Sequence, residues 1–394
     1  MISLVVPTYN ERGNVNALVE RAGAALASTK QPFELIIVDD NSPDGTADAV
    51  RALQGSRPWL RLLVRTEERG LSTAVMAGWA IARGNVLGCM DADLQHPPEV
   101  LSELVDGMGT THADIVVASR HVRGGGVSDW SLPRRCVSWT ATFLATMTLP
   151  GTLGEVRDPM SGFFLLRRDV IRGAALKPRG YKILLEVLAK GSYAGVKEVP
   201  FVFEERVEGG SKIGTSVMWD YIVHLARISF ETGEAAKIGK FALVGLSGAV
   251  VNLFLYRWLA GISFSVWAAA TIAAGVAIVN NFAWNEMFTF PETHRASPSW
   301  GAMLRRCGMF ALISGAGLLL NVAVVESLVA ILHLPWLPGV SAGVILAGAW
   351  NFFANANLTW RSDPKKRLAG ADEGLKMPQS SEPAIEKIKK FMAF

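Results

Sequence analysis

The sequence predicts an α/β domain with a mostly parallel sheet, followed by a helical membrane domain. In the first half of the chain, short apolar runs alternate with longer patterns of helical period, as expected for successive βα units. In the second half, four apolar segments free of Asp, Glu, Lys and Arg can each cross a bilayer. Of the 394 residues, 50% are hydrophobic and only 19% are charged. That composition is too apolar for an ordinary soluble enzyme.

Charge and cysteine content exclude several classes of function. The net charge is only +4 and the chain has no lysine-rich arm or aromatic and basic motif, so nucleic acid is not an expected partner. Cys89, Cys136 and Cys307 are far apart, which indicates neither a disulfide framework nor a zinc site. The N-terminus lacks the features of a signal peptide. We therefore expect the first half of the chain in the cytosol.

The first half contains the expected strands and helices in alternation. Strands are expected at residues 2–6, 33–38, 60–64, 86–90 and 115–118. Helices are expected at residues 15–26 and 72–82, from Thr46 onward, and after His96, which is interpreted as a turn residue and not as a ligand. Ligands of parallel sheets collect at the carboxyl ends of the strands. Charged and polar residues stand at those ends: Tyr9, Glu11, Asp39, Asp40, Asp91, Asp93 and Arg120.

The segment D-A-D at the end of the fourth strand is the strongest candidate site. In an extended segment the side chains of Asp91 and Asp93 project from the same face. Together with the amide oxygen of Gln95 they form a donor set that suits Mg²⁺ or Mn²⁺. A bare D-x-D is often a solvated acidic turn, but charged residues at several strand ends favour a site for a metal-bridged anion. The chain has no glycine-rich nucleotide fingerprint or P-loop, so the expected ligand is a diphosphate held by metal.

Several segments together resemble dolichol-phosphate mannose synthases of glycosyltransferase family 2. They occur in the same order and spacing as in that family and span residues 1 to about 215. They are V-V-P-T-Y-N-E-R, I-I-V-D-D-N-S-P-D-G-T, M-D-A-D-L-Q-H-P-P-E, S-R-H-V-R-G-G-G, M-S-G-F-F, G-Y-K-I-L-L-E and E-V-P-F-V-F-x-x-R-x-x-G-x-S-K. The resemblance implies a GT-A (Rossmann-like) fold for this part of the chain.

The resemblance also implies the residues of the site. Asp91, Asp93 and Gln95 fall on the metal-binding positions of the family. Arg120, Arg134 and Ser138 fall where relatives hold the phosphate of the lipid. The catalytic set would be Asp91, Asp93, Arg120, Arg206 and Lys212. The nucleotide-sugar pocket would comprise Pro7, Tyr9, Glu11, Val38, Asp40, Asp91, Ala92, Asp93, Gln95, Arg120, Arg206 and Lys212.

The implied reaction transfers mannose from GDP-mannose to dolichyl or another polyprenyl phosphate, with Mg²⁺ or Mn²⁺ as cofactor and inversion at C1. A phosphate nucleophile is already anionic and needs no general base, but it needs cations to approach a diphosphate. Arg135 is interpreted as a surface charge. Glu186, in an apolar run, is expected to pair with a base such as Lys182, one turn earlier.

Alternatives to this reaction remain at the level of sequence. The donor can be UDP-glucose or another UDP-sugar, with undecaprenyl phosphate as acceptor, because the contacts to the base are not readable. A processive polysaccharide synthase is disfavoured, since the Arg257-Trp258 pair lacks the glutamine of a Q-x-x-R-W motif. A role of the membrane half as a flippase for lipid-linked sugars or as a scaffold is a further alternative.

The second half is divided into a surface helix, a membrane domain and a tail. The pattern at residues 218–230 predicts an amphipathic helix on the bilayer surface, within a juxtamembrane segment of residues 216–235. Residues 236–361 contain two similar helix pairs, with Asn281 and Asn285 repeated as Asn351 and Asn355. These asparagines are interpreted as helix-packing residues, with a path for a polar head group as the alternative. Residues 362–394 have the composition of a disordered tail.

The orientation follows from the charges that flank the spans. Basic residues concentrate on the side shared with the catalytic half, whereas the opposite side has only Arg257. By the positive-inside rule the catalytic domain, residues 1–215, and the tail would be cytoplasmic, on a multi-pass protein of the cell membrane.

Overall fold

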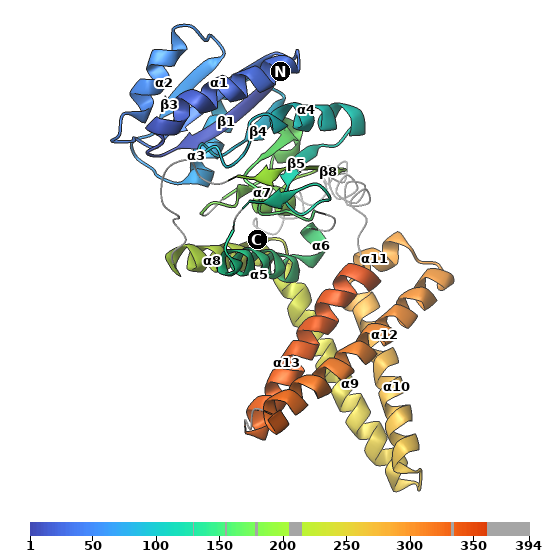
Figure 1. Cartoon of the computed structure of the whole chain (residues 1–394). Coiled ribbons are helices and arrows are strands. Elements are labelled where there is room, and N and C mark those ends of the chain that lie inside the picture. The colour runs from blue at the N-terminus through green and yellow to red at the C-terminus, as the bar shows by residue number, and fades with distance from the viewer. Residues whose placement is uncertain (129, 154–155, 178–179, 205–214, 332–334, 361–394) are drawn as a thin grey trace, which may run out of the picture.

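A computed structural model describes residues 1–360 of the chain except 129, 154–155, 178–179, 205–214 and 332–334. An α/β domain stands above two helices that lie side by side, and a bundle of long helices extends below them (Figure 1). Arg206, Lys212 and the tail expected at residues 362–394 lie outside the described residues.

The main sheet has the order β3-β2-β1-β4-β7-β5-β8. All neighbouring strands are parallel except β7, which runs antiparallel to both β4 and β5. The predicted mostly parallel sheet and its first five strands are confirmed, whereas β7 and β8 were not predicted. The strands are β1 (Ile2–Thr8), β2 (Phe33–Asp39), β3 (Leu60–Val64), β4 (Val86–Cys89), β5 (Ile115–Ser119), β7 (Phe164–Arg167) and β8 (Val196–Pro200).

Helices cover both faces of this sheet, as the apolar strands predict. Successive residues of a strand point to opposite faces, so Leu4 and Val6 pack against α1, α2 and α4 while Val5 packs against α3 and α7. This placement leaves the carboxyl ends of the strands open for ligands. The helices are α1 (Arg12–Ser28), α2 (Thr46–Gln54), α3 (Leu71–Ile81), α4 (Val100–Thr111) and α7 (Ile183–Lys190).

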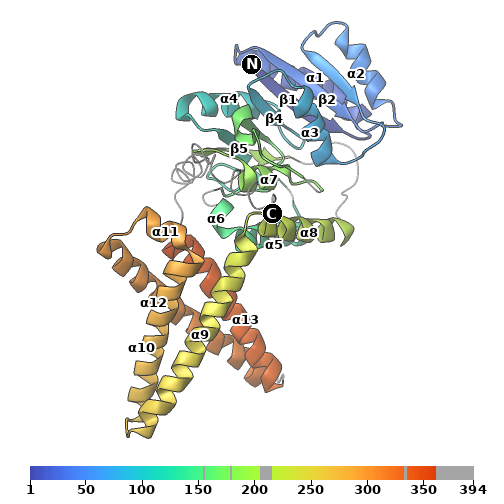
Figure 2. The same cartoon turned by 180° about the vertical axis from the view of Figure 1, so that it is seen from behind.

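Two helices close the lower end of the α/β domain, α5 (Leu132–Thr148) and α8 (Thr215–Glu231). Figures 1 and 2 show them side by side from both directions. The Tyr221 hydroxyl on α8 donates a hydrogen bond to the Ala141 carbonyl on α5 at 2.5 Å. Trp139 of α5 and Trp219 of α8 are 79% and 65% exposed, so both helices present aromatic side chains outward. The helix predicted at residues 218–230 is confirmed as part of α8.

Short elements connect these parts. The strands β6 (Gly126–Val127) and β9 (Val202–Phe203) form a small second sheet. The short helices are α6 (Pro150–Leu153), the 3₁₀ turn η1 (Arg168–Ile171) and α11 (Pro291–Ala296).

The described residues include 4 helices that are long and apolar enough to cross a membrane, as predicted. They are α9 (Glu234–Gly261), α10 (Val266–Trp284), α12 (Trp300–Val325) and α13 (Trp336–Ala354), and the last three continue into the π-helical turns η2 (Asn285–Thr289), η3 (Glu326–Ile331) and η4 (Asn355–Thr359). A turn at residues 262–265 separates α9 from α10. Pro338 lies in the first turn of α13, where a missing N–H costs nothing.

The long helices form two pairs, α9 with α10 and α12 with α13, which cross each other in Figures 1 and 2. A Cβ atom on Gly248 would lie 2.1 Å from the side-chain oxygen of Asn281. At the matching place of the second pair, a Cβ atom on Gly317 would lie 2.6 Å from that of Asn351. The same glycine and asparagine contact therefore holds each pair together, which agrees with the packing interpretation of the asparagines.

Candidate active site

A cavity of about 880 Å³ lies at the carboxyl ends of the central strands and is closed on one side by α5 and α8. Most of the predicted site residues line it: Pro7, Tyr9, Glu11, Asp40, Asp91, Ala92, Asp93, Gln95, Arg120, Arg134 and Ser138. Val38 does not appear in that lining, because its side chain is buried in the core against α3. Any contact of Val38 with a ligand must therefore use its backbone.

The D-A-D segment turns sharply after β4. Leu94 has φ +60°, a left-handed conformation that is uncommon outside glycine. This turn brings the Gln95 N–H to the side-chain oxygen Oδ1 of Asp93 at 3.2 Å. The Gln95 side chain donates from Nε2 to the Glu204 carbonyl at 3.0 Å, which fixes the orientation of its amide. Asp93 and Gln95 are both buried, at 7% and 5% exposure.

Asp91, Asp93 and Gln95 fit a hard divalent cation. A Cβ atom on Gly162 would lie 3.0 Å from Asp91 Oδ2, so only glycine leaves room beside this carboxylate. The set contains only two carboxylates, and within the described part of the chain no cluster of three or more His, Cys, Asp or Glu side chains offers an alternative metal site. Two carboxylates and an amide oxygen suit Mg²⁺ or Mn²⁺, which takes its remaining ligands from water and phosphate.

His96 packs between the D-A-D turn and three phenylalanine rings of the core. Its ring lies between 5.3 and 5.5 Å from those of Phe163, Phe201 and Phe203. Burial lowers the pKa of His96 to about 4, so the ring is neutral and its Nδ1 accepts a hydrogen bond from the Asp91 N–H at 3.3 Å. This placement agrees with the interpretation of His96 as a structural residue of the turn.

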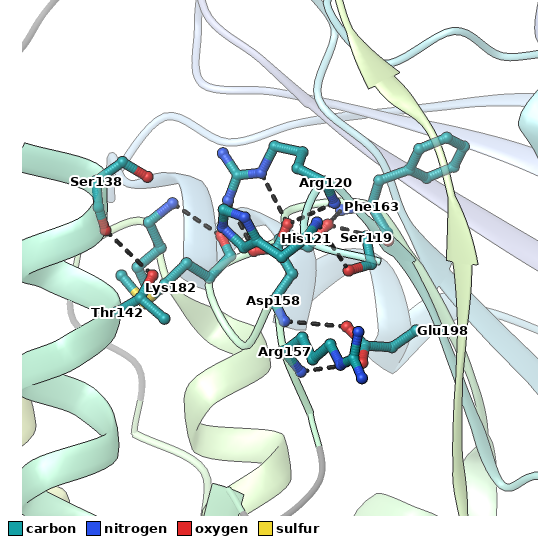
Figure 3. A network of polar contacts seen from close by, with 12 residues as sticks. Ser119, Arg120, His121, Ser138, Thr142, Arg157, Asp158, Phe163, Lys182 and Glu198 are labelled. Atoms are coloured by element: carbon teal, nitrogen blue, oxygen red, sulfur yellow. Dashed lines mark hydrogen bonds and ion pairs between the residues drawn. The ribbon is translucent and has the colours of Figure 1, made fainter. Parts of the chain in front are cut away.

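Arg120 is held in the cavity by Asp158, a residue that sequence reasoning missed. The Arg120 Nε and Nη2 atoms each donate to the Asp158 carboxylate at 2.7 Å (Figure 3). The carboxylate is fully buried. Burial alone would raise the pKa of Asp158, but the hydrogen bond and charge of Arg120 outweigh it and the pKa is lowered. Glu198 in turn accepts from the N–H groups of Arg157 and Asp158 at 2.9 and 3.0 Å.

Trp130 brings the two predicted lipid-phosphate arginines together. The Arg134 guanidinium lies 4.3 Å from the centre of the indole ring and that of Arg120 lies 5.7 Å away. Ser138 follows Arg134 by one turn of α5. Arg120, Arg134 and Ser138 therefore converge on the side of the cavity that faces α5 and α8.

The expected partnership of Glu186 with Lys182 is wrong. Lys182 precedes the first helical residue of α7 and has φ −113° and ψ 60°, so the i to i+4 relation of a helix does not apply to this pair. Its side chain lines the cavity. Glu186 pairs with Lys190 one turn later, and its other carboxylate oxygen lies 3.6 Å from the His224 ring on α8.

Asp40 and Tyr9 form the far end of the cavity. The Asp40 carboxylate pairs with Arg65 at 2.6 Å and accepts from the Gly70 N–H at 2.8 Å. The exposed Arg69 guanidinium lies 4.9 Å from the Tyr9 ring centre and donates to the Tyr9 hydroxyl at 3.2 Å. The aromatic ring of Tyr9 and the polar groups of Asp40 and Arg69 line this end, a combination that suits the base and the sugar hydroxyls of a nucleoside.

Comparison with known proteins gives two family matches and several relatives. The model for glycosyl transferase family 2 matches residues 3–173, and the model for the GtrA/DPMS transmembrane domain matches residues 240–360. A dolichol-phosphate mannosyltransferase of Pyrococcus furiosus is 36% identical over 359 residues, which cover 91% of this chain and 99% of that protein. The protein of the same name from Saccharomyces cerevisiae is 39% identical over 236 residues, which cover 57% of this chain and 86% of that protein. Among solved structures, a mannosyl-3-phosphoglycerate synthase of Rubrobacter xylanophilus aligns with a TM-score of 0.47 and 20% identity, covering 59% of this chain and 75% of that one.

Proposed function

The chain belongs to the dolichol-phosphate mannosyltransferases of glycosyltransferase family 2, and on that basis we propose that it transfers mannose from GDP-mannose to dolichyl or another polyprenyl phosphate. The predicted order of a GT-A glycosyltransferase domain and a transmembrane domain is confirmed by the two family matches. One observation carries the proposal. The carboxylates of the D-A-D segment and the cations at Trp130 line a single cavity, which α5 and α8 close.

The donor would occupy the sheet side of this cavity. Its nucleoside would lie near Tyr9 and Asp40, and its diphosphate would lie at Asp91 and Asp93. Asp91, Asp93 and Gln95 would hold Mg²⁺ or Mn²⁺, which when bound offsets the charge of the diphosphate leaving group. The turn at Leu94 and the hydrogen bonds of Gln95 keep these oxygens in place before the donor arrives.

The acceptor would enter from the side of α5 and α8. Its phosphate oxygen is anionic at neutral pH, so it attacks C1 of the sugar without a general base. The new bond joins C1 to the lipid phosphate, the bond from C1 to the diphosphate breaks, and GDP leaves from the opposite side with inversion at C1. Arg120, Arg134 and Ser138 bind and orient the attacking phosphate, and the two guanidinium groups reduce its repulsion by the donor.

The membrane supplies the acceptor. The exposed Trp139 and Trp219 on α5 and α8 support contact of this face with the bilayer surface. Lys237 and Lys240 begin α9 next to the α/β domain, whereas Arg257 stands alone at the far end of that helix. This bias supports a cytoplasmic catalytic domain.

The test supplies polyprenyl phosphate and each labelled nucleotide sugar to the purified protein. We expect label from GDP-mannose, and not from UDP-glucose, in the lipid phase, and its loss when a chelator removes divalent metal. Asp93→Asn should reduce transfer by roughly a hundredfold or more, because an ordered charge at the leaving group is lost. Asp106→Asn, on the exposed face of α4, is the matched control. Transfer from UDP-glucose alone, or unchanged transfer by Asp93→Asn, would overturn the proposal.

A further inference from the structure

Lys182 places an incompletely bonded ammonium group in the cavity. Its Nζ atom donates one hydrogen bond, to the Met160 carbonyl at 2.9 Å. No carboxylate lies within ion-pair distance of it in the part of the chain that the structure describes. An ammonium has three donors, so two remain for a group inside the cavity.

The surroundings of Lys182 favour an anionic ligand. Burial is the main reason why the pKa of Lys182 is lowered, and the positive charge of Arg120 adds to it, while Asp91 and Asp158 act in the opposite direction. The charge of Arg120 is balanced by the Asp158 carboxylate, but Lys182 has no such partner among the described residues. A cation removed from water without a counter-ion is costly, and a bound phosphate would remove that cost.

The position of Lys182 indicates which phosphate it meets. Lys182 donates to the Met160 carbonyl, and the Met160 sulfur lies 3.7 Å from the Tyr221 hydroxyl. Tyr221 in turn links α8 to α5. Figure 3 shows Lys182 beside the Arg120 and Asp158 pair, on the side of Ser138 and α5. Lys182 is thus on the acceptor side of the cavity, although Asp91 is near enough to influence it.

We propose that Lys182 is a phosphate-binding residue of the transfer reaction, whose ammonium binds the phosphate of the lipid acceptor as it approaches the donor. Lys182 moves no proton. Its ammonium offsets the negative charge of the acceptor phosphate, which Arg120 offsets only in part because Arg120 is already paired with Asp158. This inference rests on the proposed function for the identity of the acceptor.

The test compares Lys182→Gln and Lys182→Arg with the unchanged full-length protein in detergent. Binding of a short-chain prenyl phosphate and binding of GDP are measured separately, along with the KM for polyprenyl phosphate and the midpoint of thermal unfolding. We expect Lys182→Gln to weaken prenyl phosphate binding by about tenfold to a hundredfold, as for a lost charge-assisted hydrogen bond. GDP binding should stay unchanged, and Lys182→Arg should recover part of the acceptor affinity.

Lys190→Gln is the matched control at the other end of α7. Its ammonium also binds a backbone carbonyl, that of Ala175 at 3.2 Å, but it is paired with Glu186 and Glu231 outside the cavity. This variant should lower the unfolding midpoint and leave prenyl phosphate binding intact. Lys182→Gln with the same result would reduce Lys182 to a structural tether, and an equal loss of GDP binding would place it at the donor; either outcome overturns the inference. If Lys182→Gln weakens prenyl phosphate binding but the unchanged protein transfers no mannose, the proposed function fails, whereas phosphate binding by Lys182 stands.

Discussion

Asp158 and Trp130 position the cations of the cavity. The Arg120 guanidinium donates two of its N–H groups to Asp158, and this pair of hydrogen bonds fixes the orientation of the guanidinium plane. Only the N–H groups that do not face Asp158 can bind a phosphate. The Arg134 guanidinium stacks at 4.3 Å on the ring of Trp130. A cation over an aromatic face is stabilised without being neutralised. The ring of Trp130 therefore helps to define the position of the Arg134 guanidinium at the cavity.

Trp130→Ala removes the ring that faces both Arg120 and Arg134, and a contact of this kind is worth about 0.5–2 kcal/mol. We expect the KM for polyprenyl phosphate to rise by about twofold to thirtyfold, because the arginines lose their orientation. Steady-state kinetics with GDP-mannose at saturation measures the change. The KM for GDP-mannose should change less than the KM for polyprenyl phosphate.

Trp130→Phe separates the ring from the indole N–H. This donor is buried and has no hydrogen-bond partner among the described residues. If stacking is its contribution, Trp130→Phe should retain most of the acceptor affinity. An unchanged acceptor KM in Trp130→Ala would instead mean that the arginines are positioned by other contacts.

Individual site residues were predictable where the signal was local. Asp91 and Asp93 stand at the end of an apolar strand with the spacing that puts both on one face, and the structure places both in the cavity. Asp158 and Lys182 gave no such signal. Asp158 meets Arg120 across 38 residues and Lys182 meets Met160 across 22, and contacts of that span depend on the completed fold. The motifs M-S-G-F-F and G-Y-K-I-L-L-E lie next to Asp158 and around Lys182, but they did not indicate the roles of these two residues.

At the scale of elements, a buried carboxylate on α7 is one of the contacts that attach α8 to the α/β domain. Glu186 of α7 is fully buried. It accepts from the Lys177 N–H at 2.9 Å, pairs with Lys190, and lies 3.6 Å from the His224 ring and 3.7 Å from the Arg227 guanidinium of α8. Glu186 thus links α7 to α8, and it lies outside the cavity lining itself.

We predict that Glu186→Gln loosens α8. Lys190 and Arg227 keep Glu231 as a partner, so the loss of the Glu186 charge should cost about 1–3 kcal/mol. The midpoint of thermal unfolding should therefore fall and hydrogen exchange over residues 215–231 should accelerate. Glu103→Gln, on the exposed face of α4, is the matched control and should change neither. Unchanged exchange in α8 of Glu186→Gln would show that the packing of α5 is sufficient.

The same carboxylate predicts a pH dependence. Burial alone would raise its pKa, but His224, Lys190 and the Lys177 N–H outweigh burial and lower the pKa of Glu186 from 4.5 to about 2. The folded protein therefore takes up this proton only at lower pH than the unfolded chain. The stabilisation is complete above about pH 4.5 and is lost as the pH falls toward 2. The difference in unfolding midpoint between the unchanged protein and Glu186→Gln should shrink over that range.

Elements were predictable where periodicity was strong, and their order in space was not. The first five strands follow from short β-branched runs. The run Phe163 to Leu166 is equally apolar, but no strand was predicted there. In the structure β7 enters between β4 and β5 in the antiparallel direction. A local pattern carries no information about which strands become neighbours.

For the whole molecule, a charged cluster is among the contacts that join the two membrane helix pairs. Arg306 of α12 donates from Nε to both oxygens of Glu286 at 3.1 Å, and the Trp360 indole donates to the same carboxylate at 2.7 Å. In the repeat, Ala356 occupies the place that corresponds to Glu286. The two pairs are thus similar in their internal packing. They differ in what they supply to the contact between them, because only the first pair has a carboxylate at this place. The repeat was visible in the sequence, whereas this inequality required the arrangement of the pairs.

The cavity and the long helices lie in different parts of the chain. Every described residue that lines the cavity lies between Pro7 and His224, so the long helices contribute no described group to the site. A chain of residues 1–235 should keep α5, α8 and the complete cavity wall. We expect it to transfer mannose to a short-chain prenyl phosphate in detergent at a rate comparable to that of the full chain. With a long-chain acceptor in vesicles its rate should fall by about a hundredfold, since it loses the effective concentration that an anchored enzyme has at the bilayer. If the shortened chain is folded, binds GDP and transfers to neither acceptor, the membrane helices take part in the chemistry and not only in anchoring.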